Sequence, residues 1–352
     1  MVTFLSVLMV FSILILIHET GHFLMAKRMG VRIERFSFGF GPKLLSFKKG
    51  ETEYLVCAIP LGGYVKMAGD EPTETRKGKE WEYLSKPPIK RFGIVVSGPL
   101  TNYLLAFLLF SLIFVLGAPV ITTEVGGVMK DFPAYSAGIK EKDIIISIDG
   151  KNINYWEDLL IEVSKAISGK QMDIVVLRKD EPVSVKLIPK VIETKNIFSQ
   201  HIKVGRLGII SAGKIVTVRT NVLKALYLGG KKTFLLTGFT YKALWHIITG
   251  GMPVRESLTG PIGIAAIIGK AAEMGIIYLI SITAQINLAI AIFNLLPFPV
   301  LDGGHILFLG LEKLRRKPLS PKVEQVITQI AITLLIMVAI FVSWNDILKI
   351  IK

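Results

Sequence analysis

Four apolar stretches, each long enough to cross a lipid bilayer, constrain this chain more than any other feature. A transmembrane helix needs about 20 consecutive and mostly apolar residues. Hydrophobic residues make up 51% of the 352 residues, and the mean hydropathy of +0.54 is too high for an ordinary soluble enzyme. We therefore predict a polytopic α-helical membrane protein with about four transmembrane helices. The four stretches cover residues 4–26, 94–118, 275–296 and 323–344.

Charge predicts how these spans are oriented. The formal net charge is +15, and basic residues gather between the first two stretches and between the last two. The positive-inside rule places both of these loops in the cytoplasm, and it places both termini and the long segment between the second and third stretches outside. We expect such a chain to contact anionic membrane lipids. The sequence contains no zinc-finger or aromatic-basic RNA-binding pattern, so nucleic acid is not an expected partner.

The first apolar stretch contains the motif H-E-x-x-H, formed by His18, Glu19 and His22. On a helix, positions i and i+4 lie on one face, so both imidazoles can bind one Zn²⁺ and the glutamate can reach a water on the metal. Ionisable residues inside a membrane span are energetically costly and indicate a function. A buried polar network or a proton path is the alternative.

A third metal ligand is expected at the end of the third stretch, where the sequence reads N-L-L-P-F-P-V-L-D-G-G-H over residues 294–305. The prolines break the helix, and irregular backbone at membrane depth is tolerated where it is buried in protein or lines a cavity. Asp302 follows this break and can point back at His18 and His22. Taken alone, L-D-G-G is equally typical of an ordinary turn. His305 is expected to have a structural role.

Together, the two motifs resemble those of the site-2 protease family of intramembrane zinc proteases, in particular the bacterial regulator-of-sigma-E protease type. The segments S-G-P-L-T-N (97–102) and L-T-G-P-I-G-I (258–264) resemble further parts of that family. The resemblance implies that His18, His22 and Asp302 bind zinc. Glu19 is then the catalytic base, which takes a proton from the zinc-bound water and passes it to the leaving amine.

Two asparagines are candidates for substrate binding. Asn294 matches a family residue that holds the substrate backbone, and Asn102 is the second candidate. For both, hydrogen bonding between helices is the alternative. A helical substrate must unwind before its peptide bonds are exposed, and a free strand edge can hold it extended. Gly and Pro punctuate strand-like segments after the first span, and the predicted hairpin over 53–67 offers such an edge or forms a plain cap. The strand-like segments are 35–40, 43–47, 53–59 and 64–67.

The pattern P-A-x-x-A-G-I-x-x-x-D-x-I-x-x-I-D-G at 133–150 resembles a circularly permuted bacterial PDZ domain. A peptide groove would include residues 205–209, where backbone N–H groups can receive a C-terminal carboxylate. The domain would either bind a peptide or exclude bulky substrates from the membrane site. It is expected at 119–213, with a helix over 156–168 and strands over 127–130, 173–178 and 183–189.

In the segment after this domain, the residue pattern predicts a helix over 221–248 with lysines on one face. It either lies in the membrane interface or packs on protein with a solvated basic face, and Gly229 and Gly230 are a candidate break in it. The parts expected in order are the first transmembrane helix (1–29), a cytoplasmic-side β-hairpin region (30–93), the second transmembrane helix (94–118), an extracytoplasmic PDZ domain (119–213), an amphipathic interfacial segment (214–272), the third transmembrane helix (273–297), the L-D-G motif with a cytoplasmic loop (298–322), and the fourth transmembrane helix with the C-terminus (323–352).

The predicted function is intramembrane zinc metalloendopeptidase. Family resemblance implies single-pass membrane substrates, such as an anti-sigma factor or a remnant signal peptide, and a location in the bacterial cytoplasmic membrane. A catalytically silent membrane PDZ scaffold is the main alternative, and the intact Glu19 argues against it. A metal or proton transporter is a further alternative. The outer halves of the spans contain almost no ionisable residues, which argues against a transporter.

Overall fold

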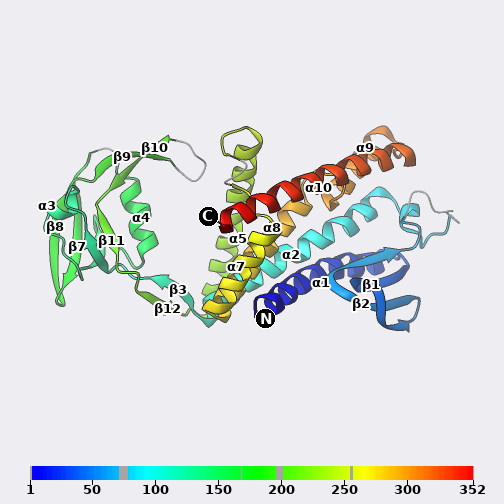
Figure 1. The fold of residues 1–352 in the computed structure, drawn as a ribbon, viewed down its shortest axis with the longest axis horizontal. Helices are drawn as coiled ribbons and strands as arrows, with labels where there is room; N and C mark the ends of the chain where they lie inside the picture. Colours follow the sequence, from blue (N-terminus) through cyan, green and yellow to red (C-terminus); the bar gives the residue numbers. More distant parts are fainter. Residues whose placement is uncertain (1, 71–77, 168, 196–200, 254–256, 352) are drawn as a thin grey trace. The chain divides into compact units, whose positions relative to one another are not determined.

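The computed structural model describes residues 2–70, 78–167, 169–195, 201–253 and 257–351 (Figure 1). The chain divides into two compact units. The first unit comprises 1–113, 222–242 and 254–352, and the second comprises 114–221 and 243–253. The first contains the long apolar helices, and the second is rich in β-strands.

Four helices of the first unit are long and apolar enough to cross a membrane. They confirm the number and the order of the predicted spans. The second begins at Pro88, ahead of the predicted residue 94, because proline suits the first turn of a helix and the helix continues beyond the apolar span. The four are α1 (Val2–Arg28), α2 (Pro88–Leu116), α8 (Ile276–Asn294) and α10 (Pro321–Ile351).

Glycines let the helices of this unit approach closely, as is typical of membrane helix packing. A methyl group on Gly21 of α1 would overlap the carbonyl oxygen of Ser97 on α2. Helix α7 (Pro261–Met274) packs on α1 in the same way, since a methyl group on Gly269 would overlap Thr3. The start of α7 is also fixed to α10, because Asp346 accepts hydrogen bonds from the backbone N–H groups of Gly260 and Gly263, at 3.0 and 2.8 Å.

Helix α5 (Val222–Ile248) runs without interruption through Gly229 and Gly230, so the break considered for this position is wrong. The reason is packing: Gly229 lies against Ser111 of α2, where a side chain would not fit. Lys232 lies over the ring of Phe110, with its Nζ 5.3 Å from the ring centroid. These contacts favour a helix packed on protein for this part of α5.

The region between the first two spans forms a β-sheet, as predicted, but with different pairing. Strands β1 (Ile33–Lys49) and β2 (Thr52–Met67) pair antiparallel with several register shifts. Phe36 lies opposite both Tyr54 and Val65, so the first half of β1 lies between two parts of β2.

The predicted hairpin over 53–67 is therefore wrong in its pairing. Within the described register, its two arms pair with β1 and not with each other. Gly39 and Gly41 have φ values of 90° and 84°, which glycine adopts readily and which let β1 change direction between its halves. A short 3₁₀ helix, η1 (Tyr83–Ser85), precedes α2.

The stretch 298–322, expected as a motif followed by a loop, contains helix α9 (Asp302–Arg315). The sequence signal was present, because the segment is amphipathic and ends in basic residues that suit a helix C-terminus. Asp302 is thus the first residue of a helix and not part of a turn.

The second unit has a core of buried aliphatic residues, among them Ile145, Leu159, Ile174 and Leu207. The expected helix after residue 156 and all three expected strands are present, although the helix is shorter than predicted. A four-stranded sheet has the order β6-β5-β7-β8, and the remaining strands form the antiparallel pairs β3–β12, β4–β11 and β9–β10. The elements are β3 (Ala118–Ile121), β4 (Val125–Val128), α3 (Pro133–Ser136), β5 (Ile144–Ile148), β6 (Lys151–Asn152), α4 (Trp156–Ser164), β7 (Met172–Arg178), β8 (Glu181–Leu187), β9 (Lys190–Lys195), β10 (His201–Arg206), β11 (Ile209–Ser211) and β12 (Ile215–Val218).

An ion pair with a buried carboxylate joins the start of β5 to the end of β7. Asp143, just before β5, accepts hydrogen bonds from Arg178 Nε at 2.9 Å, from Arg178 Nη2 at 2.7 Å and from the N–H of Lys140 at 2.8 Å. Burial alone would raise the pKa of Asp143, but these hydrogen bonds and the guanidinium charge outweigh it and hold that pKa below its ordinary value.

Candidate metal centre

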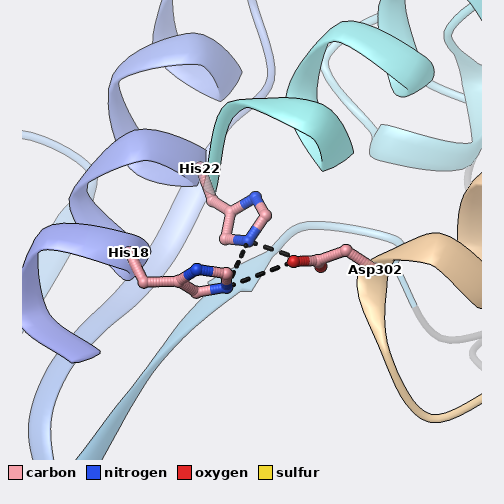
Figure 2. Close-up of side chains that lie close together, drawn as sticks. All are labelled: His18, His22 and Asp302. Carbon is pink, nitrogen blue, oxygen red and sulfur yellow. Dashed lines mark hydrogen bonds and ion pairs between the residues drawn. The ribbon is translucent and has the colours of Figure 1, made fainter. Parts of the chain in front are cut away.

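Three side chains that could bind a metal ion come from distant parts of the chain and lie close together in the first unit (Figure 2). His18 and His22 lie one turn apart on α1, and Asp302 opens α9. The Nε2 atoms of the two histidines are 3.2 Å apart. Asp302 Oδ2 lies 3.2 Å from Nε2 of His18, and Oδ1 lies 3.5 Å from Nε2 of His22. Their potential ligand atoms all lie within 4.8 Å of one another.

This donor set fits a zinc ion. Tetrahedral zinc with bonds of about 2.0–2.1 Å to nitrogen and oxygen places neighbouring ligand atoms about 3.3 Å apart. The separations among His18, His22 and Asp302 agree with that value. Two imidazoles and one carboxylate supply three ligands, which leaves a fourth position for water or substrate as catalytic zinc requires. The side chains present therefore suit a catalytic zinc and not a closed structural site.

Helix α2 sets the orientation of the histidines. His22 Nδ1 lies 2.8 Å from the backbone oxygen of Ile94, and a carbonyl oxygen can only accept a hydrogen bond. Nδ1 of His22 is therefore the donor, and its Nε2 is the nitrogen turned toward Asp302. Gly98 makes this approach possible, since a methyl group there would overlap the His22 ring.

The glycines after Asp302 let the preceding loop fold across the start of α9. A methyl group on Gly303 would overlap the backbone oxygens of Leu295 and Leu296, and one on Gly304 would overlap that of Phe298. The carboxylate of Asp302 also lies in the first turn of α9, where the helix dipole favours negative charge. The L-D-G-G sequence thus presents the carboxylate to α1.

A cavity of about 600 Å³ adjoins the three ligands. Glu19 lines it, on the same helix as the histidines, and so do Tyr64 and Val65 of β2. Strand β2 passes close to the glutamate, because a methyl group on Gly63 would lie 3.5 Å from Glu19 Cγ. The cavity therefore brings together a proposed metal, a carboxylate able to hold a proton, and a strand.

The two asparagines lie in different surroundings. Asn294, at the end of α8, lines the cavity. Asn102 is completely buried, and its Nδ2 lies 3.3 Å from Nδ1 of His18. Its geometry favours hydrogen bonding between helices, the alternative raised above. A direct role for either asparagine in substrate binding stays a prediction.

Sequence reasoning missed several residues of the cavity wall. The buried Arg91 of α2 and the partly buried Glu312 of α9 form an ion pair 2.5 Å long, and both line the cavity with Tyr83. Burial raises the pKa of the Tyr83 hydroxyl above its ordinary value. His305, expected to be structural, also lines the cavity. Tyr83, Arg91 and Glu312 belong to no recognisable local motif, because they come from segments far apart in the sequence, whereas His305 ends the motif at 294–305.

The four apolar helices and this donor set define a membrane protein with a candidate catalytic metal centre. Residues 6–338 match the sequence profile of Peptidase family M50, and the chain belongs to that family.

Curated relatives are similar along nearly the whole chain. Metalloprotease MmpA of Caulobacter vibrioides is 32% identical, with 98% of this chain and 95% of the relative covered. Zinc metalloprotease RasP of Geobacillus kaustophilus is 30% identical, with coverage of 98% and 97%. The regulator of sigma-W protease RasP of Bacillus subtilis is 28% identical, with coverage of 98% for both chains.

Proposed function

We propose that this protein is an intramembrane zinc metalloendopeptidase that cuts single-pass membrane proteins within or near their transmembrane segments. Membership of Peptidase family M50 and the zinc metalloprotease relatives support a zinc-dependent peptidase. The observation that carries the proposal is the convergence of His18, His22 and Asp302 beside a cavity that contains Glu19. A scaffold without catalysis would not need this arrangement.

In this proposal, His18, His22 and Asp302 bind zinc through two nitrogens and a carboxylate oxygen. Zinc, when bound, acts as a Lewis acid that lowers the pKa of water and polarises the scissile carbonyl. Glu19 accepts the proton of the attacking water on its carboxylate and later donates it to the leaving amine. Helix α1 holds the base and two of the ligands on one rigid element, so their spacing is fixed.

The substrate segment must be extended when it reaches these residues, because a helix shields its own peptide bonds. Residues 63–67 of β2 pair with β1 on one side, and Tyr64 and Val65 line the cavity. We infer that this part of β2 holds the unwound substrate by strand addition. Asn294, on the cavity wall, then hydrogen-bonds the substrate backbone.

The proposed substrates are single-pass proteins such as an anti-sigma factor, or a remnant signal peptide. The Bacillus subtilis relative is named a regulator of sigma-W protease, which supports the first class. Together with anionic lipids, these are the proposed partners. The proposed location is the bacterial cytoplasmic membrane, with the metal centre toward the cytoplasm and the second unit outside.

Residues 119–213, within the second unit, are proposed to form a PDZ domain. A groove of about 600 Å³ runs between α4 and the segment from β10 to β11, and residues 205–209 belong to its wall, which supports this proposal. Apolar side chains of α4, such as Leu160 and Val163, form the opposite wall. The groove suits the C-terminus of an extended peptide, and steric exclusion of bulky substrates is the alternative role.

Cleavage of a reconstituted single-span substrate tests the proposed function. Wild type should cut it, a chelator should stop the reaction, and Glu19→Gln should abolish cutting while the protein still binds zinc. Equal cutting by wild type and Glu19→Gln would refute the role of Glu19. If a panel of single-span substrates stays intact although zinc binds, the silent scaffold is favoured.

A further inference from the structure

One face of α2 contacts both candidate histidine ligands. Ile94, Gly98 and Asn102 are spaced four residues apart, so they lie on the same side of the helix. The Ile94 oxygen accepts from His22, Gly98 leaves room for that ring, and the Asn102 side chain meets His18. The two imidazoles are thus oriented by chemically different partners.

The partner of His22 permits a single hydrogen-bonding state. A neutral imidazole has one N–H donor and one acceptor nitrogen. Because the Ile94 carbonyl can only accept, the proton of a neutral His22 lies on Nδ1. Its Nε2 then has the lone pair that a metal requires, and this is the nitrogen facing His18 and Asp302.

The partner of His18 permits two states, because an amide can donate or accept. If Asn102 Nδ2 donates to Nδ1 of His18, the histidine proton lies on Nε2, which then cannot bind a metal. If the amide group turns over, Oδ1 accepts from Nδ1–H and Nε2 is free to bind. Among the described residues, Oδ1 of Asn102 is buried without a hydrogen-bond partner, so turning replaces the contact of Nδ2 with His18 by a hydrogen bond to this oxygen.

We propose that Asn102 is a positioning residue whose Oδ1 accepts a hydrogen bond from Nδ1–H of His18, so that Nε2 of His18 is held ready to bind zinc. Asn287 of α8 supports this arrangement, since its Nδ2 donates to the Asn102 backbone oxygen at 2.7 Å. Both asparagines are completely buried, so water does not compete for these bonds. The inference rests on the proposed function, because it concerns the same metal centre.

Zinc binding by the purified full chain tests this inference through competition with a chelator. Asn102→Leu, which removes hydrogen bonding at similar size, should weaken zinc binding by about 10–100-fold, the usual effect of losing a partner of a metal-bound histidine. Asn102→Asp, whose carboxylate can only accept, should retain wild-type affinity or exceed it. In the zinc-bound state, the His18 Nδ1 proton should exchange with water slowly in wild type and Asn102→Asp, and faster in Asn102→Leu, as seen by NMR.

Thr101→Val is the matched control. Thr101 is the neighbour of Asn102, and its hydroxyl bonds the backbone oxygens of Ile17 and Gly98 without touching either histidine. It should leave zinc affinity unchanged. If Asn102→Leu binds zinc with wild-type affinity, the inference is wrong. An equal loss of zinc affinity in Asn102→Leu and Asn102→Asp would also overturn it, because that result would show that Asn102 acts through packing and not through its hydrogen bond. If the wild-type protein binds no zinc, the proposed metal centre itself is refuted. This result differs from one in which wild type binds zinc and only the role of Asn102 is refuted.

Discussion

Buried charged groups occur in both units, and the two sets differ in where their hydrogen bonds go. In the second unit, Asp143 is bonded to Arg178 and to the Lys140 amide, so the chain itself neutralises the carboxylate. In the first unit, His18, His22 and Asp302 direct their ligand atoms at one another beside a cavity. The comparison teaches that a buried charge with opposite-charge partners indicates structure, whereas converging donors indicate an additional ligand.

Removal of a proposed metal ligand should have the largest effect. Asp302→Ala deletes the carboxylate from the donor set, so zinc affinity should fall by more than about 100-fold, beyond the usual effect of losing a supporting residue. Cleavage of the test substrate should fall to background. Elemental analysis of the purified protein and a cleavage assay measure both. Retention of one zinc per chain in this variant would show that the third ligand is another residue.

Loss of the Arg91–Glu312 pair should have the second-largest effect, on both stability and activity. Arg91→Ala leaves the partly buried Glu312 without its partner, which should cost less than the about 3–5 kcal/mol typical of a fully buried pair. Because Glu312 lies on the helix that begins with Asp302, activity should fall together with the melting temperature. Thermal unfolding in detergent measures the loss. An Arg91→Glu, Glu312→Arg double variant should recover part of it, and no recovery would show that the pair does not act through its charges.

A methyl group that crowds the His22 ring should lower zinc affinity less than removal of Asp302 does. Gly98→Ala places a methyl group where the ring lies, and overpacking costs about 1–3 kcal/mol. Zinc affinity should fall by about 10-fold or more, as measured by chelator competition. Gly93→Ala is the matched control on α2, because a methyl group there makes only an ordinary contact with Met29. Equal affinities in the two variants would contradict the role given to Gly98.

Loss of the ion pair between Asp143 and Arg178 in the second unit should have the smallest effect on the metal centre. Asp143→Asn should destabilise the second unit by about 1.5–3 kcal/mol, the usual contribution of a hydrogen bond to a charged group. Zinc affinity should not change. Hydrogen exchange of the backbone amides of β5 and β7, measured by mass spectrometry, shows whether these strands lose stability.

The same pair predicts a pH dependence. The pKa of Asp143 is lowered on folding, so its contribution to stability is present above the unfolded pKa, which is about 3.9 for aspartate. That contribution is lost as the pH falls below this value and through the lower folded pKa. Asp143→Asn should remove this part of the acid sensitivity of β5 and β7. An unchanged acid response would show that other groups cause it.

The sequence predicted those parts of the molecule that depend on local patterns. Apolar runs gave the four spans, and the i, i+4 spacing placed His18 and His22 on one face of a helix. The break before Asp302 predicted its approach to the histidines, although the helix that it begins was not foreseen. Local pattern was sufficient here because each feature is determined within one turn or one span.

Features that depend on contacts between distant segments could not be predicted in this way. Strand segments separated by glycine and proline suggested hairpins, but the observed register pairs Phe36 with both Tyr54 and Val65, which lie in separate segments of β2. The Arg91–Glu312 pair and the meeting of Asn102 with His18 each need two helices in a particular rotation. Spacing within one segment contains no information about that rotation.

The arrangement of the ligands also has a consequence for biosynthesis. His18 and His22 contact α2, which follows them closely in the sequence, whereas Asp302 is translated roughly 280 residues later. At about 5–20 residues per second, Asp302, the proposed third ligand, is made on the order of 15–60 s after the histidine pair. The proposed metal centre can therefore be completed only when most of the chain has been made. A truncated chain that stalls before Asp302 lacks the carboxylate and with it one of the three proposed ligands.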